Sequence, residues 1–150
     1  MGSFPINGVK TYPITVLDDC SRMILACCLY TKGRAKEVVK TLEIAVKQYN
    51  APLHIYTDNG GQFLSKKFSA ACSRAGITHI KTAITHPQGI GKIERWHRNL
   101  QEEFLDLTPF TSVEEAQLAL DKYVYYYNHE RSHMGINGAT PHARYEERLP

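Results

Sequence analysis

The sequence predicts an α/β layered domain with a mixed β-sheet. Three observations lead to this class. Two apolar stretches suited to strands come first, segments with helical and strand periodicity then alternate, and two further helical segments follow. The 150 residues are enough for one domain with a sizeable core.

The first two strands are predicted from residues 11–19, "TYPITVLDD", and residues 22–30, "RMILACCLY". The second stretch is apolar on both faces, which is typical of a central strand. The short segment "DDCS" between them has turn chemistry. We therefore expect an antiparallel hairpin.

Helices and strands should alternate in the middle of the chain. The expected elements are a helix over 34–49, a strand over 53–57, a helix over 65–76 and a strand over 77–83. Ser65 is suited to cap the second helix, and Gly76 is suited to end it. A helix between two strands favours a crossover connection and parallel pairing.

The last part of the chain is predicted to be mainly helical. Residues 84–91, "ITHPQGIG", contain one proline and two glycines and predict a loop. A third helix should run from near Gly91 to about Asp106, and a fourth, capped by Ser112, over 112–128. The remaining residues, 129–150, look polar and irregular.

The composition excludes several classes of protein. The 43% hydrophobic and 22% charged residues are ordinary for a soluble globular domain, and no apolar run approaches the roughly 20 residues of a membrane span. The first residues lack the apolar core of a secretory signal. None of the four cysteines forms a C-x-x-C pair, so we expect reduced cysteines in an intracellular protein. A net charge of +3 is weak evidence for a nucleic-acid partner.

The segment "IYTDNGGQF" places Asp58 at the end of a predicted strand, followed by a loop with almost no side chains. Two interpretations remain open. Asp-Asn-Gly is turn chemistry in itself. Alternatively, the bare backbone lets a metal ion or a phosphate approach the carboxylate.

Glu94 is the best partner for Asp58. It opens the third helix beside an apolar stripe, although the helix dipole alone also favours a glutamate there. Two carboxylates beside a glycine-rich loop suit Mg²⁺, which prefers oxygen ligands. The neighbouring cations Lys92, Arg95 and Arg98 are suited to hold phosphates.

Four segments of the chain resemble the integrase catalytic core shared by retroviral integrases and bacterial insertion-sequence transposases. These segments are "ITVLDDCSRMILA", "YTDNGGQF", "HPQGIGKIERWHRNLQEE" and "YYNHERSHMGINGATPHARY". They occur in the family's order and cover nearly the whole chain. Asp58 and Glu94 lie 36 positions apart (94 − 58), which matches the last two acids of the family's Asp-Asp-Glu triad.

The resemblance implies a ribonuclease-H-like fold with a five-stranded mixed sheet flanked by helices. It makes Asp58 the second triad acid and Glu94 the third, and both would bind metal. Asn59 and Gln62 belong to the same motif and are expected to shape the site or contact DNA. The core would span 1–128, with a C-terminal tail over 129–150.

The chain departs from the family pattern in three places. Ile90 stands where relatives usually carry Asn, and Ser132 where the tail often has Pro. The alignment also places the first triad acid before Met1, so the first strand is expected to be truncated. Asp18 and Asp19 align instead with the family's turn after the second strand, where acids are expected to satisfy turn amides.

The implied function is that of the catalytic core of a DNA transposase or integrase. Water would cut a DNA end, and the freed 3′-hydroxyl would then attack target DNA, with two Mg²⁺ or Mn²⁺ ions as cofactors. The partners would be the element ends, target DNA and at least one second copy of the chain, in the cytoplasm of a bacterium. The 150 residues alone are expected to be inactive, because the first acid is missing.

Two alternative functions remain open from the sequence. The first is a nuclease of the same fold, which only hydrolyses DNA. The second is a non-catalytic DNA-binding or oligomerisation module left by a decayed element. His129 and His133 have the i, i+4 spacing of some zinc sites, but no Glu or Cys completes a ligand set, so we expect a role in tail structure or DNA contact.

Overall fold

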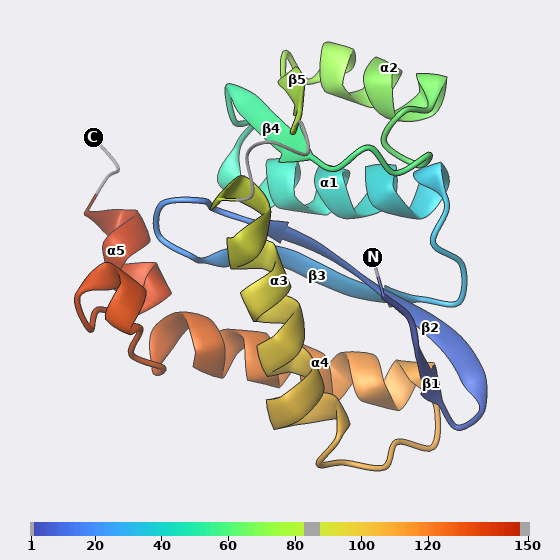
Figure 1. Ribbon diagram of the computed structural model, residues 1–150, viewed down its shortest axis with the longest axis vertical. Coiled ribbons are helices and arrows are strands. Elements are labelled where there is room, and N and C mark those ends of the chain that lie inside the picture. The colour runs from blue at the N-terminus through green and yellow to red at the C-terminus, as the bar shows by residue number, and fades with distance from the viewer. Residues whose placement is uncertain (1, 83–87, 148–150) are drawn as a thin grey trace.

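The computed structural model describes residues 2–82 and 88–147 (Figure 1). The strands are β1 (Phe4–Ile6), β2 (Val9–Leu17), β3 (Ile24–Tyr30), β4 (His54–Thr57) and β5 (Thr78–Lys81). The α-helices are α1 (Ala35–Tyr49), α2 (Lys66–Arg74), α3 (Gln88–Leu100), α4 (Val113–His129) and α5 (Pro141–Glu146). A π-helical turn (Gln101–Leu105) follows α3, and a 3₁₀ turn (Met134–Ile136) precedes α5. None of the helices in these residues is long and apolar enough to cross a membrane.

The two strand pairings that the sequence predicts, the hairpin β2–β3 and the parallel pair β4–β5, are both present. β2 and β3 form the expected antiparallel hairpin, whose register shifts between Val16 and Leu17. β1 adds to β2 in the antiparallel sense. β4 and β5 are parallel, with Thr57 opposite Lys81. The crossover through α2 therefore connects parallel strands, as expected.

The five strands form two sheets rather than one. Within the described residues the hydrogen-bonded order is β1-β2-β3 in one sheet and β4-β5 in the other. The single five-stranded mixed sheet implied by the resemblance is therefore not confirmed in detail, because β4 and β5 pair only with each other in the described residues. β1 has three residues and pairs with β2.

Two apolar clusters fill the space on either side of the hairpin. On one side α1 packs against β2 and β3, α2 packs on α1, and the buried members include Ile14, Leu42 and Phe68. On the other side α4 packs against β3, and Trp96 of α3 joins the same buried cluster as Leu120 of α4. Figure 1 shows this layering, with α1 above the hairpin and α4 below it. The predicted α/β layered class is confirmed.

The prediction that β3 is a central strand is wrong. β3 is an edge strand, and it is apolar on both faces because α1 covers one face and α4 the other. Side-chain amides of α4 satisfy its free edge. Asn128 accepts from Ile24 N and donates to Ile24 O, both at 2.9 Å, and Gln117 does the same for Leu29 N and Cys27 O at 2.7 and 3.2 Å. These amides take the place of a neighbouring strand.

The predicted ends of α2 and α4 are confirmed by their caps. The Ser65 hydroxyl accepts from Phe68 N, and the Ser112 hydroxyl accepts from Glu115 N at 3.1 Å. Gly76 follows α2 with φ +69°, a conformation that favours glycine.

The predicted loop over 84–91 is wrong at its C-terminal end. Residues 84–87 lie outside the described part of the chain, but α3 already begins at Gln88. Its first turns include Gly91, because packing of the apolar stripe outweighs the weak helix propensity of glycine.

The tail is also more regular than predicted. It contains the 3₁₀ turn and α5, which packs against α4. The Thr140 hydroxyl caps α5 and Pro141 occupies its first turn. This Thr-Pro pair is a local helix-start signal that the sequence contains.

Candidate active site

Asp58 follows β4 directly, at the edge where the parallel strands β4 and β5 both end. Its carboxylate is exposed, and Oδ1 accepts a hydrogen bond from Gly60 N at 2.8 Å. The turn interpretation of Asp58 is therefore correct as far as it goes. One carboxylate oxygen fixes the loop, while the group as a whole stays open to solvent.

A side chain at Gly60 would crowd the side chains of Gln62 and Asp58. A Cβ atom there would lie 2.7 Å from Gln62 Nε2 and 2.9 Å from Asp58 Oδ1. Gln62 is half-buried and Asn59 is exposed. The predicted site residues Asp58, Asn59 and Gln62 thus share one compact turn, closed by Phe63 N donating to Gly60 O at 2.9 Å.

Glu94 lies in the second turn of α3, and its side chain is exposed. Two contacts fix this part of the helix against the hairpin. Lys92 Nζ donates to Asp19 Oδ1 at 2.7 Å, and the buried Trp96 donates through Nε1 to Thr15 Oγ1 at 3.0 Å. Glu94 therefore stands between two anchors. None of the hydrogen bonds and ion pairs of residues 2–82 and 88–147 involves its carboxylate.

The basic residues expected to contact DNA differ in their surroundings. Arg95 and Arg98 are exposed on α3. Lys92 is different, because its side chain is only 28% exposed and its ammonium is held by both the carboxylate and the main-chain carbonyl of Asp19. No sequence pattern points to this partner, which is 73 positions away.

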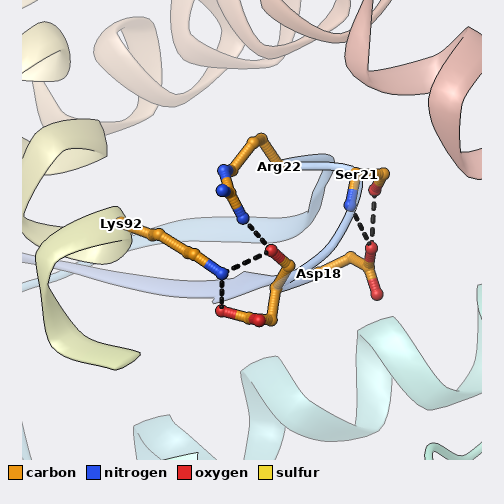
Figure 2. A network of polar contacts seen from close by, with 5 residues as sticks. Asp18, Ser21, Arg22 and Lys92 are labelled. Carbon is orange, nitrogen blue, oxygen red and sulfur yellow. Dashed lines mark hydrogen bonds and ion pairs between the residues drawn. The ribbon is translucent and has the colours of Figure 1, made fainter. Parts of the chain in front are cut away.

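The acids of the turn after β2 have the structural role expected of them (Figure 2). Asp18 Oδ2 accepts from the amide and the hydroxyl of Ser21, both at 2.7 Å. Asp19 accepts from Lys92. Arg22 donates to the main-chain carbonyl of Asp19 rather than to a carboxylate. The Asp19–Lys92 pair was missed by sequence reasoning.

The histidines of the tail belong to aromatic contacts. The ring of His129 lies 4.4 Å from that of Tyr125 and 4.2 Å from that of His142, and the His133 ring meets Tyr127 edge-on at 4.5 Å. Burial lowers the pKa of His133. In the described part of the chain, no three His, Cys, Asp or Glu residues gather to hold a metal. The expected role of His129 and His133 in tail structure fits these contacts.

The order of the elements and the motifs around Asp58 and Glu94 point to a known family, and comparison with family profiles identifies which one. The family profile for the integrase core domain matches residues 2–87, and a second profile with the same description matches residues 75–141. The chain belongs to the integrase core domain family. The resemblance expected from the sequence motifs is confirmed.

Relatives of this integrase core include proteins of mobile elements. It is 27% identical to the putative integrase ORF3 of a Spiroplasma virus, over 88% of this chain and 41% of that protein. It is 24% identical to the putative transposase InsK of the insertion element IS150 of Escherichia coli, over 92% of this chain and 50% of that protein. The chain thus spans at most half the length of either relative.

Solved integrase cores share the fold. The HTLV-2 integrase catalytic core domain, solved in complex with magnesium, superposes with a TM-score of 0.75 over 95% of this chain and 90% of its own, at 23% identity. At that identity the likeness shows the fold alone. The ribonuclease-H-like α/β class predicted from the sequence is therefore confirmed.

Proposed function

We propose that this integrase core acts in DNA transposition or integration, by cleaving DNA ends and joining them to target DNA through direct transesterification. The observation that carries this proposal is the placement of two exposed acids. Asp58 stands on a rigid turn at the shared end of β4 and β5, and Glu94 stands on α3, fixed between its two anchors to the hairpin.

The residues present fit a divalent cation of the Mg²⁺ type. Asp58 and Glu94 offer hard carboxylate oxygens, and Mg²⁺ retains several waters when it is bound by only one or two carboxylates. The magnesium in the HTLV-2 core supports this choice, and Mn²⁺ has the same oxygen preference. When bound, the ions would supply charge stabilisation and a lowered pKa for the attacking hydroxyl.

The side chains of this core have distinct roles in the proposal. Asp58 and Glu94 hold the metal, and the Gly60 amide keeps the Asp58 carboxylate in one orientation. Arg95 and Arg98 bind phosphates of the DNA backbone, and Asn59 and Gln62 shape the loop beside it. In the joining step the 3′-oxygen forms a bond to phosphorus, the bridging P–O bond of the target strand breaks, and the leaving oxygen takes up a proton.

The proposal also concerns the first acid of the Asp-Asp-Glu triad, because Asp58 and Glu94 account only for the second and third. We keep the expectation that it precedes Met1 and that residues 1–150 alone are inactive. Asp18 and Asp19 are the acids nearest in sequence, but Asp18 is used by Ser21 and Asp19 by Lys92. These contacts support a structural role for both, and with two acids alone the bridging ligand of a two-metal site is absent.

The test is strand transfer with a labelled duplex in Mg²⁺ or Mn²⁺, comparing residues 1–150 with a chain extended upstream by about ten codons. In the active form, Asp58→Asn and Glu94→Gln should each abolish cutting and joining, because each removes the charge that holds the metal. Folding and DNA binding should persist. Normal strand transfer by Glu94→Gln contradicts the assignment of this acid.

The same assay separates the other functions. Hydrolysed ends without joined products would identify a nuclease, and DNA binding without either product would identify a non-catalytic module. Association with a second copy is part of the proposal, supported by the dimeric and trimeric forms in which the HTLV-2 core was solved. Sedimentation of the chain with and without DNA measures it.

A further inference from the structure

Two cations meet at a single oxygen atom beside α3. The main-chain carbonyl of Asp19 accepts hydrogen bonds from Arg22 Nη1 and from Lys92 Nζ, the latter at 3.0 Å (Figure 2). Because both donors reach the same oxygen atom, they lie within about 6 Å of each other. The guanidinium and the ammonium are therefore close neighbours of like charge.

Within the residues that the structure describes, the two positive charges of Arg22 and Lys92 form an ion pair with only one carboxylate, that of Asp19. The Asp19 carboxylate reaches Lys92 at 2.7 Å. Among the ion pairs of residues 2–82 and 88–147, none joins Arg22 to a carboxylate. The Asp19 side chain is also 63% exposed, so it can turn into solvent, and exposed pairs of this kind contribute little stability.

The backbone of Arg22 gives a second, independent observation. Its φ is +67°, in the left-handed region that Gly and Asn adopt most readily and that arginine rarely adopts. Arg22 N donates to Asp18 O at 3.0 Å, so the turn itself needs only a backbone amide here. A residue held in a disfavoured conformation points to a function of its side chain.

The position of the pair relative to Glu94 indicates which phosphate it would meet. Lys92 precedes Glu94 by two positions, which is about 3 Å along the axis and roughly 200° around the helix. The two side chains therefore leave α3 in different directions. A phosphate held by Lys92 would therefore be a different one from the phosphate that reacts.

We propose that Arg22 and Lys92 form a binding site for a backbone phosphate of DNA, and that the Asp19 carboxylate occupies this site in the free protein. Bound DNA displaces the carboxylate and takes over its contact with Lys92, while also neutralising Arg22. This inference rests on the proposed DNA function and extends it. It adds Arg22 to the DNA-binding residues and makes Asp19 an internal competitor.

The experiment is fluorescence anisotropy of a labelled duplex oligonucleotide with the 150-residue chain, over a series of salt concentrations. Asp19→Asn should tighten binding by up to about fivefold, the ceiling set by the strength of an exposed ion pair. Arg22→Ala and Lys92→Ala should each weaken binding and lower the salt slope by about 0.9. Glu43→Gln is the matched control, because Glu43 also forms an exposed pair, at 3.7 Å with Arg74.

A protein that carries both Asp19→Asn and Lys92→Ala distinguishes competition at this site from a general effect of the lost negative charge. If Asp19 competes for Lys92, the gain from Asp19→Asn should disappear in the Lys92→Ala background. An equal gain from Glu43→Gln, or a gain that survives Lys92→Ala, overturns the site while leaving DNA binding intact. Absence of DNA binding by the unaltered chain overturns the site and the DNA function together.

Discussion

Asn128 offers a direct test of how the edge of β3 is satisfied. The side chain is 4% exposed and makes two hydrogen bonds of 2.9 Å to the backbone of Ile24, which is itself 1% exposed. Asn128→Ala leaves one buried donor and one buried acceptor without partners. Each such group costs about 1–3 kcal/mol, so we expect the free energy of unfolding to fall by about 2–6 kcal/mol.

A loss of that size is large for a domain of ordinary stability, which is about 5–15 kcal/mol in total. The measurement is urea unfolding followed by circular dichroism, with the m-value as a check on two-state behaviour. Gln117→Ala is the control. It removes the same amide group from the same edge, but Gln117 is only half-buried and water can replace its bonds.

The expected order is therefore a large loss for Asn128→Ala and a loss below about 1.5 kcal/mol for Gln117→Ala. Asn128→Asp should be as damaging as alanine, because a carboxylate cannot donate to Ile24 O and is buried with its charge. Equal, small losses for Asn128 and Gln117 would refute the view that the Asn128 amide replaces a strand.

Two further predictions concern the turn after β4 and the histidine of α3. Gly60→Ala should change the free energy of unfolding by less than about 1 kcal/mol, because the atoms that the new methyl group would crowd are ends of exposed or flexible side chains. It should nevertheless displace the Asp58 carboxylate and so reduce strand transfer by the active form. Unchanged strand transfer would contradict the role of Gly60. Burial lowers the pKa of His97 in the folded protein, so on acidification the unfolded chain binds a proton at this imidazole before the folded protein does. The free energy of unfolding should therefore fall as the pH drops through about 6.5. His97→Gln should flatten that dependence in urea unfolding, the same change at the exposed His54 should not, and identical pH profiles for all three proteins would contradict it.

Local signals in the sequence predicted most of the elements. The caps Ser65 and Ser112, the glycine after α2 and the apolar stripes of α1 and α4 all lie where periodicity and capping placed them. The errors fell at segments with weak local preference. The glycines of the first turns of α3 hid a helix that packing stabilises, and the Thr140–Pro141 start signal was overlooked in a polar tail.

The candidate site was predictable in part for the same reason. Asp58, Asn59 and Gln62 belong to one short turn, so their grouping follows from the chain itself. The sharing of an ion by Asp58 and Glu94 stays a prediction. The capture of Lys92 by Asp19 required the hairpin turn and α3 to meet in space.

The sequence by itself determined the family and the order of strands and helices, because motifs, periodicity and caps act over a few residues along the chain. Only the tertiary structure decided that β3 is an edge strand closed by amides of α4, and that Asp19 holds Lys92 beside Arg22. These partners are about 70 to 100 positions apart in the chain. Their contacts depend on where α3 and α4 cross the hairpin, and side-chain packing rather than local preference sets that crossing.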